Sequence, residues 1–270
     1  MTKGTDGMPK RPIGVFDSGI GGLTVLKELL ARLPGESFVY FGDTARVPYG
    51  TKSAETVLRF SRENVRLLLD RGVKMVVVAC NTASAEALPQ IEGEFPVPII
   101  GVIEPGVRAA VQATRSGVIG VIGTAGTIRS EAYQRGIRAL RPEAKVIPKP
   151  CPLFVPLAEE GWVDHPVTRE VAREYLSVYQ DSGIDALVLG CTHYPLLKGV
   201  IGEVMGEGVR LVDSAVETAL AVERVLQANG IRGGGGDRFH LILSDTSPAF
   251  EETAARFLGR PVSGVELVSV

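Results

Sequence analysis

Two short apolar runs, VVVA at residues 76–79 and LVLG at residues 187–190, each lead into a cysteine that opens a polar turn. Each run is rich in Val or Leu and is followed by residues that start helices, which is typical of a fully buried strand. Cys80 and Cys191 are therefore predicted to lie at the carboxyl ends of two strands. Because α/β sheets bind ligands beyond those ends, both cysteines are candidate functional residues.

A second pair of segments, IGVFDSG at 13–19 and IGVIGTAG at 119–126, is separated by a similar offset. A helical pattern and a glycine turn also precede each cysteine strand. These matches indicate an internal duplication. Two similar α/β units that face each other would place one cysteine on each side of a shared cleft.

Strand and helix patterns alternate along the chain, which predicts parallel sheets with right-handed crossovers. The expected fold class is α/β, with two similar pseudo-symmetric domains, each a mainly parallel sheet flanked by helices, and an active site in the cleft between them. We expect a mobile leader at 1–12, a discontinuous first domain at 13–105 plus 213–270, and a second domain at 106–212.

The local patterns also predict individual elements. Ser53 and Thr82 are expected to cap the helices that follow them, and residues 151–160 are expected to form a tightly packed apolar loop. Beyond a flexible glycine turn at 233–236, a last strand and helix should pack on the first unit. Strands are expected at 13–16, 38–41, 76–79, 99–103, 118–122, 145–148, 187–190, 209–212 and 239–243, and helices at 23–33, 53–71, 83–92, 167–180, 214–227 and 248–258.

Composition excludes several classes of protein. Hydrophobic residues make up 45% and charged residues 22% of the 270 positions, which is near the usual values for globular proteins. The net charge of −2 and the scattered Lys and Arg argue against nucleic acid as a partner. No apolar stretch approaches the roughly 20 residues of a membrane helix, and the polar segment 1–11 is not a secretory signal. A cytoplasmic location is expected.

Cys80, Cys151 and Cys191 are an odd number without a C-x-x-C pair, which favours free thiols over a disulfide framework or a zinc site. A buried cysteine is often only a small apolar filler. The matching strand ends of Cys80 and Cys191 favour a reactive role, because a helix amino terminus helps a thiol to ionise. Cys151 lacks that context and is expected to be structural.

Other polar residues lie near the predicted strand ends. His193 shares the loop with Cys191 and could assist proton transfer, since histidine titrates near neutral pH. Asp17 and Glu159 are candidate carboxylates for the two sides of the cleft. The glycine turn at 17–22 offers a helix amino terminus for an anion, although such turns also serve close packing alone.

Six motifs, taken together and in order, resemble the glutamate racemase family of the aspartate/glutamate racemase superfamily. The resemblance runs from about residue 13 to residue 218, and the combination is highly specific. The motifs are DSGIGG at 17–22, PYG at 48–50, ACNTAS at 79–84, GTAGT at 123–127, CPLFVPL at 151–157 and GCTHYP at 190–195.

The resemblance implies a cofactor-independent enzyme that interconverts L- and D-glutamate, a reaction with which bacteria supply D-glutamate to peptidoglycan. Cys80 would exchange the α-proton on the D side and Cys191 on the L side, one as thiolate base and the other as thiol acid. Two opposed groups invert the centre, whereas a single base tends to return the proton to the same face. The α-proton is weakly acidic, so the site must stabilise the carbanion-like state by hydrogen bonds and exclusion of water.

The resemblance also implies the surrounding roles. Asp17 would assist Cys80, while Glu159 and His193 would assist Cys191, and the motif does not decide between Glu159 and Glu160. No metal or cofactor is expected, and a homodimer is implied. The implied substrate contacts are Asp17, Ser18, Tyr49, Gly50, Asn81, Thr82, Thr124, Thr127, Thr192 and His193.

Three alternatives remain at this level. The first is a racemase for another amino acid such as aspartate, with the same two-thiol chemistry. The second is a non-catalytic amino-acid-binding or regulatory protein that uses the cleft without turnover. The third is a redox pair, which would require the Cα atoms of the two cysteines to approach within about 7 Å.

Overall fold

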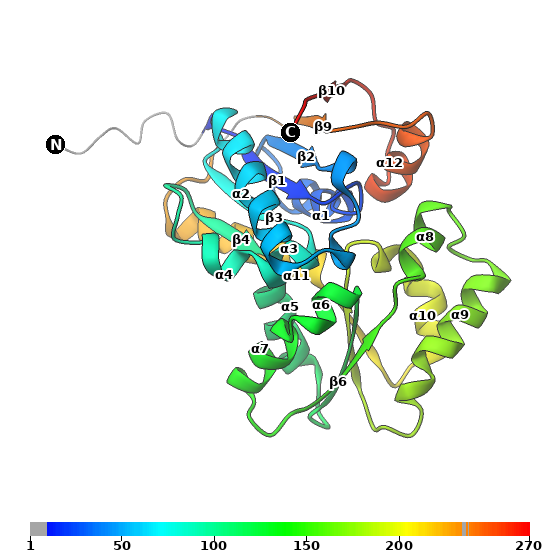
Figure 1. The fold of residues 1–270 in the computed structure, drawn as a ribbon. Coiled ribbons are helices and arrows are strands. Elements are labelled where there is room, and N and C mark those ends of the chain that lie inside the picture. The colour runs from blue at the N-terminus through cyan, green and yellow to red at the C-terminus, as the bar shows by residue number, and fades with distance from the viewer. Residues whose placement is uncertain (1–9, 234–235, 237) are drawn as a thin grey trace.

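The computed structural model describes residues 10–233, 236 and 238–270 (Figure 1). Most of the expected leader, residues 1–9, lies outside the described residues, as do Gly234 and Gly235 of the four-glycine turn. The chain forms two sheets, and every strand pairing in them is parallel. In Figure 1 the first sheet lies in the upper half of the molecule and the second sheet in the lower half.

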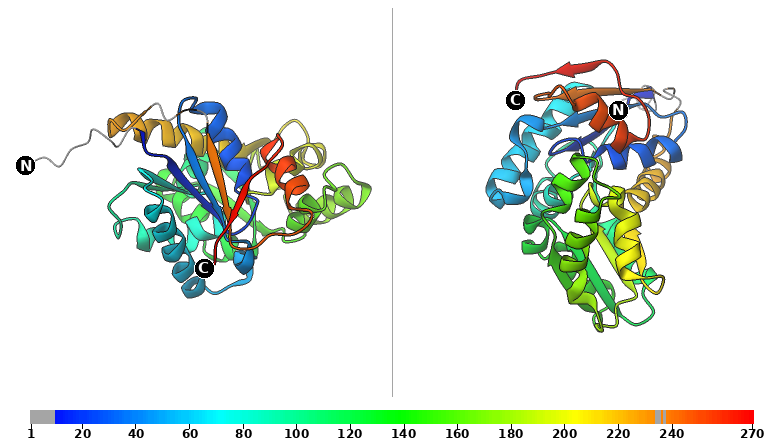
Figure 2. Two further views of the ribbon diagram at one scale, coloured as in Figure 1. Left: turned by 90° about the horizontal axis from the view of Figure 1, so that it is seen from above. Right: turned by 90° about the vertical axis from the view of Figure 1, so that its right-hand side faces the viewer.

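The first sheet has the strand order β10-β9-β2-β1-β3-β4. Four of its strands come from the amino-terminal part of the chain and two from the carboxyl-terminal part, so the last segment completes this sheet beside β2 (Figure 2). The strands are β1 (Ile13–Asp17), β2 (Phe38–Gly42), β3 (Met75–Val78), β4 (Ile99–Gly101), β9 (Phe239–Leu243) and β10 (Val265–Leu267).

The second sheet has the order β6-β5-β7-β8, which repeats the order β2-β1-β3-β4 of the first sheet. Its strands are β5 (Val118–Gly123), β6 (Lys145–Pro150), β7 (Ala186–Gly190) and β8 (Arg210–Asp213). Cys80 and Cys191 thus follow corresponding strands, β3 and β7, and the expected pair of similar parallel α/β units is confirmed. The division of the chain into domains at 105/106 and 212/213 stays a prediction.

Helices cover both faces of each sheet, and the chain passes between the two units through α5 and α11, which contact each other (Figure 1). The α-helices are α1 (Leu23–Arg32), α2 (Ala54–Asp70), α3 (Asn81–Glu86), α4 (Leu88–Ile91), α5 (Ile103–Ala113), α6 (Ala125–Arg129), α7 (Ala132–Leu140), α8 (Phe154–Glu159), α9 (Pro166–Leu176), α10 (Lys198–Met205), α11 (Ser214–Ala228) and α12 (Phe250–Leu258). Short 3-10 turns are η2 (Thr44–Arg46), η3 (Tyr49–Thr51), η4 (Ser177–Tyr179) and η5 (Tyr194–Leu197).

Alternation along the strands sends neighbouring side chains to opposite faces. In β1, Val15 joins an apolar cluster with α1 and α11, whereas Phe16 joins a second cluster with α2. The first cluster continues into the other unit, where it includes Leu189 of β7 and Ile201 of α10. Burying one such side chain stabilises the fold by about 1.5–3 kcal/mol, so the continuous cluster fixes how the two sheets sit together.

The two capping predictions have different outcomes. Ser53 caps α2 as expected, because its Oγ accepts from the backbone N–H of Thr56 at 3.3 Å. The prediction that Thr82 caps the following helix is wrong, because α3 begins at Asn81 and Cys80 is its N-cap. The sulfur of Cys80 accepts from the backbone N–H of Ala83 at 3.5 Å. The candidate reactive atom therefore occupies the capping position itself.

Several element boundaries also differ from expectation. Residues 151–160 are not only a loop, since Phe154–Glu159 form α8, with Pro156 in its first turn. The helix expected at 83–92 is divided into α3 and α4, and Pro89 lies in the first turn of the second part, where proline is tolerated. The strand expected at 99–103 ends at Gly101, and α5 begins at Ile103.

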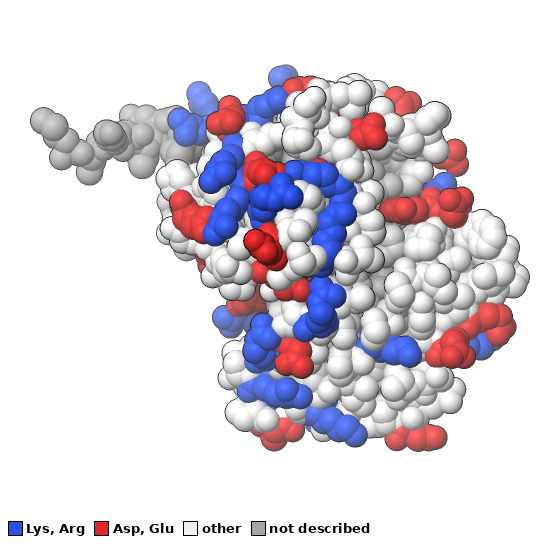
Figure 3. Space-filling model, in the orientation of Figure 1, with Lys and Arg blue, Asp and Glu red and all other residues white. Residues whose placement is uncertain are grey.

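On the face drawn in Figure 3, Lys and Arg side chains gather along α2 and continue onto the second unit, with acidic side chains among them. Arginines of α2 and its C-cap form ion pairs, such as Arg62 with Glu94 and Arg71 with Glu266. The face is therefore mixed in charge, and the exclusion of nucleic acid stays a prediction. Within the described residues, no helix is long and apolar enough to cross a membrane.

Candidate active site

Cys80 lies at the end of β3 with only 6% of its surface exposed. Its thiol donates to Oγ of Ser18 at 3.6 Å while the sulfur accepts from the backbone of α3. Burial, and to a smaller extent the negative charge of Asp17, raises the pKa of the Cys80 thiol to about 12. Cys80 is thus a thiol at neutral pH and can serve as a proton donor.

Asp17 ends β1, the strand next to Cys80's own strand, and is 1% exposed. Its Oδ2 accepts from the backbone N–H of Gly19 at 3.0 Å, whereas its buried Oδ1 has no partner. Burial raises the pKa of this carboxyl, and the charge of His193 partly opposes the rise. A buried acceptor without a partner is costly, so Oδ1 is suited to a donor that a ligand brings.

Cys191 follows β7 and is 5% exposed. Its Sγ lies 3.8 Å from Nδ1 of His193, and Nε2 of His193 lies 2.8 Å from Oε1 of Glu159. Burial alone would lower the pKa of His193, but the contacts with Cys191 and Glu159 raise it to about 10. The contacts run from the Cys191 thiol through the His193 imidazole to the Glu159 carboxylate. Of the two neighbouring glutamates, Glu159 is the one that contacts His193.

The two cysteine loops face each other across the junction of the units. The glycine turn after β1 contacts the second loop directly, because a Cβ atom added to Gly21 would lie 2.3 Å from Oγ1 of Thr192. The hydroxyl of Thr24 donates to the carbonyl of Thr192 at 2.9 Å. The absence of a side chain at Gly21 therefore allows the loops to meet.

Three threonine hydroxyls form a second bridge between the units. Oγ1 of Thr82 lies 2.9 Å from Oγ1 of Thr124 and 3.3 Å from Oγ1 of Thr127. Thr124 also caps α6, since its Oγ1 accepts from the backbone N–H of Thr127 at 3.1 Å. Gly50 packs against Thr124, where an added Cβ would lie 2.8 Å from Cβ of Thr124. The predicted contacts on PYG, ACNTAS and GTAGT thus lie together.

Asn81 begins α3 immediately after Cys80. Its Oδ1 accepts from the hydroxyl of Tyr133 at 2.8 Å, and its buried Nδ2 has no partner. The site therefore holds an unpaired donor on Asn81 as well as the unpaired acceptor on Asp17. An amino acid offers the complementary groups, a carboxylate and an ammonium.

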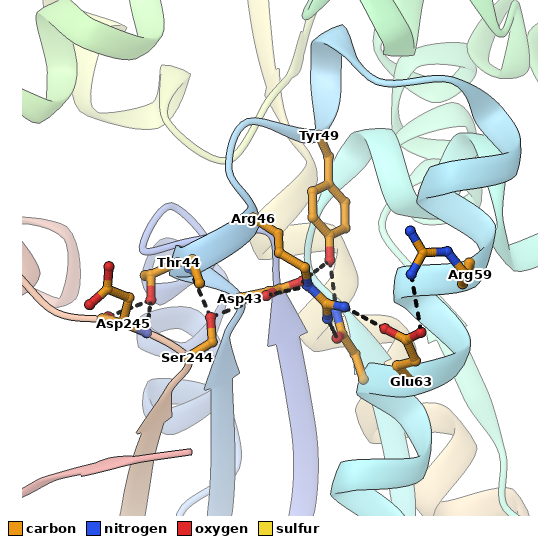
Figure 4. A network of polar contacts seen from close by, with 10 residues as sticks. Asp43, Thr44, Arg46, Tyr49, Arg59, Glu63, Ser244 and Asp245 are labelled. Carbon is orange, nitrogen blue, oxygen red and sulfur yellow. Dashed lines mark hydrogen bonds and ion pairs between the residues drawn. The ribbon is translucent and has the colours of Figure 1, made fainter. Parts of the chain in front are cut away.

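Tyr49 is buried, and its hydroxyl points toward Asp43 (Figure 4). The hydroxyl donates to Oδ2 of Asp43 and accepts from Nδ2 of Asn64 at 3.1 Å. Nε of Arg46 donates to the same carboxylate at 2.7 Å, and Ser244 after β9 donates to it at 3.1 Å. The Tyr49 hydroxyl therefore already has protein partners, and contact of Tyr49 with a substrate stays a prediction.

A cavity of about 340 Å³ opens beside the site. The first unit contributes Gly19, Ile20 and the segment after β9, and the second unit contributes Glu159 and Glu160. Neither thiol lines this cavity. It is lined by residues of the glycine turn and by Glu159, which contacts His193.

The residues that the resemblance implied lie around the junction of the two units, some beside Cys80 and others beside Cys191. Cys151 is not one of them, although it belongs to the same apolar cluster as Cys191. Cys151 is fully buried, and its thiol donates to the carbonyl of Lys149 at 3.6 Å. Sequence reasoning missed Tyr133, Asp43, Arg46 and Thr24. Asp43 and Arg46 lie in the polar loop before PYG, which was the available signal, while nothing local marks Tyr133. No group of three or more His, Cys, Asp or Glu in the described part of the chain is arranged to hold a metal ion.

Two parallel sheets of the same strand order, each with a thiol beyond a central strand, define a two-unit α/β protein with a thiol on each side of its junction. The sequence profile of the Asp/Glu/Hydantoin racemase family matches residues 13–222, and the chain belongs to that family.

Known proteins are similar to this chain over nearly its whole length. Glutamate racemase of Geobacter metallireducens is 54% identical over 265 residues, which cover 97% of this chain and 98% of that protein. The crystal structure of glutamate racemase isoform RacE1 from Bacillus anthracis has a TM-score of 0.92 at 40% identity and covers 96% of this chain and 98% of that one. Glutamate racemase from Francisella tularensis in complex with D-glutamate has a TM-score of 0.91 at 39% identity and covers 97% and 98%.

Proposed function

We propose that this protein is a glutamate racemase that inverts the α-carbon of glutamate with two opposed thiols, Cys80 and Cys191. The observation that carries the proposal is the pair of thiols beyond corresponding strands, each with its own acid-base partners. Cys80 lies beside Ser18 and Asp17, whereas Cys191 lies beside His193 and Glu159. The similarity to glutamate racemases across the whole chain supports glutamate as the substrate.

In the L-to-D direction, the Cys191 thiolate takes the α-proton and the Cys80 thiol gives its own proton to the opposite face of the same carbon. The reaction leaves Cys191 as the thiol and Cys80 as the thiolate, and the D-to-L direction uses this state in reverse. His193, held by Glu159, stabilises the thiolate of Cys191 as an imidazolium. Asp17 keeps Cys80 protonated until the carbanion forms, because its charge opposes a second negative charge nearby.

Substrate binding satisfies the unpaired buried atoms. The ammonium donates to Oδ1 of Asp17, and a carboxylate accepts from Nδ2 of Asn81. The remaining proposed contacts are Ser18, Tyr49, Gly50, Thr82, Thr124, Thr127, Thr192 and His193. Backbone and hydroxyl donors around the α-carboxylate stabilise the charge that develops there, which is the main barrier to removing a weakly acidic proton.

Several properties of the family extend the proposal. The enzyme would act without a cofactor in the cytoplasm and supply D-glutamate for peptidoglycan, and a homodimer is the assembly that we expect. The two units would be domains formed by residues 13–105 with 213–270 and by residues 106–212. Their junction then encloses the substrate.

The test incubates purified protein with L-glutamate in D₂O without an added cofactor and follows optical rotation together with loss of the α-proton signal. The wild type inverts glutamate. Cys80→Ser still exchanges the α-proton of L-glutamate, and Cys191→Ser that of D-glutamate, but neither variant inverts. Cys151→Ser is the matched control, because this buried thiol is outside the site, and it retains inversion.

Other outcomes would redirect the proposal. Inversion of aspartate but not glutamate would keep the mechanism and replace the substrate. Binding of glutamate by calorimetry without exchange in the wild type would favour the non-catalytic binding protein. Inversion that survives either single substitution would overturn the two-thiol mechanism.

A further inference from the structure

Tyr133 of α7 crosses the junction of the two units. Its side chain is fully buried, and its hydroxyl donates to Oδ1 of Asn81 at 2.8 Å. Asn81 is the first residue after Cys80, whereas Tyr133 belongs to the helices that cover the second sheet. The preceding Glu131 has a left-handed backbone (φ 55°), which separates α6 from α7 and turns the chain before Tyr133.

The ring of Tyr133 packs against the strand that carries the other thiol. A Cβ atom added to Gly190 would lie 3.1 Å from Cε2 of Tyr133, and one added to Gly106 would lie 3.1 Å from Cε1. Gly190 directly precedes Cys191. A single side chain therefore contacts the backbone before one thiol and hydrogen-bonds the residue after the other.

The hydroxyl contact determines which way the amide of Asn81 points. Oδ1 is occupied by Tyr133, so the buried Nδ2 remains as the unpaired donor. Rotation of the amide by half a turn would exchange its oxygen and nitrogen and present an acceptor where Nδ2 now lies.

We propose that Tyr133 is a positioning residue that fixes the Asn81 amide so that Nδ2 donates to the α-carboxylate of the substrate. The α-carboxylate is one bond from the carbon that Cys80 and Cys191 deprotonate, and it gains negative charge as the proton leaves. A fixed donor at that place stabilises the transition state more than the ground state. The proposal rests on the proposed racemisation of an amino acid.

The test compares Tyr133→Phe with the wild type in the optical-rotation assay. Removing a donor to developing charge costs about 10²–10³-fold in kcat, and a donor that is only misoriented should cost less, about 10-fold. The loss should fall on kcat more than on KM. In an Asn81→Ala background the added Tyr133→Phe substitution should have little further effect, because Tyr133 acts through Asn81.

Tyr179→Phe is the matched control. Tyr179 is also a buried tyrosine, but its hydroxyl donates to the carbonyls of Val121 and Ile147 within the second unit. This variant should lose stability without a change in kcat. Equal effects of Tyr133→Phe with and without Asn81, or an unchanged kcat, would overturn the inference while the active wild type upholds the racemase. A wild type inactive on both glutamate and aspartate would instead remove the proposed function.

Discussion

His193 and Glu159 are joined by a contact of 2.8 Å between Nε2 and Oε1, although they come from different segments of the second unit. The carboxylate holds the imidazole whose other nitrogen faces Cys191. We expect Glu159→Gln to lower kcat/KM about 5-fold, since a half-exposed charge pair contributes roughly 1 kcal/mol. The loss should be equal in the two directions, because the enantiomers have equal free energy. Glu160→Gln, which lacks this contact, is the control and should retain activity.

The raised pKa of His193 predicts a pH-dependent difference in stability. The folded-state pKa of about 10 lies above the usual value of 6.5, so protonated His193 stabilises the folded protein fully below about pH 6.5. This contribution is lost as the pH rises towards 10. Thermal unfolding should therefore show a larger deficit for His193→Gln at pH 6 than at pH 10. A deficit that grows with pH would contradict the assignment.

The pH dependence of alkylation tests whether the pKa of the Cys80 thiol is raised. In a Cys151→Ser/Cys191→Ser background, the rate with iodoacetamide should rise about 10-fold per pH unit through pH 10 without a plateau, because thiolate is the reactive form and the pKa is about 12. Slow access to a buried thiol lowers the whole curve but does not move its inflection. A plateau below pH 9 would show that Asp17 and burial do not suppress ionisation.

Close packing at the glycine turn predicts a strong effect of one methyl group. Gly21→Ala would place Cβ 2.3 Å from Oγ1 of Thr192 and 2.5 Å from Nδ1 of His193. Displacing these groups by about 1 Å should lower kcat/KM by about 10²-fold. Gly199→Ala in α10 meets no atom within 4 Å, so it should leave activity unchanged and stabilise the helix by up to about 1 kcal/mol. Equal activity of the two variants would contradict the contact.

The Asp43 network should matter for stability (Figure 4). Asp43 is fully buried and is paired with Arg46, so Asp43→Asn should lower the free energy of unfolding by about 1.5–3 kcal/mol, because it weakens charge-assisted hydrogen bonds while Arg46 keeps its ion pair with Glu63. Ser244→Ala removes one hydrogen bond to Asp43 and should cost about 1 kcal/mol. Urea titration measures both. Similar small losses in the two variants would show that the buried pair is not the central contact.

Local signals in the sequence were sufficient for the strands that carry the thiols. The runs before Cys80 and Cys191 are short, apolar and followed by helix starts, and each forms a fully buried strand. The helix at Ile103–Ala113 was missed because Pro105 and Gly106 lower its helical propensity, yet Pro105 lies in the first turn where proline is tolerated. Helix α8 was hidden in the same way by Pro156.

The relations between site residues depend on tertiary contacts. Glu159 and Glu160 are equivalent in the sequence, and only the packing of α8 beside the Cys191 loop brings Glu159 to His193. Tyr133 meets Asn81 across the junction of the units, and no periodicity predicts a contact between positions so far apart. The motifs identified which segments meet, but not which atoms they leave unpaired.

The parallel pairing of β2 with β9 has a consequence for the order in which the chain can assemble during synthesis. The strands of the second sheet have all left the ribosome once residue 213 has emerged, whereas β9 begins only at Phe239. Until then β2 is the edge of an incomplete sheet, with unpaired backbone groups that invite association with other chains. The second unit can therefore complete its sheet first, whereas the sheet of the first unit stays incomplete until β9 and β10 have been synthesised.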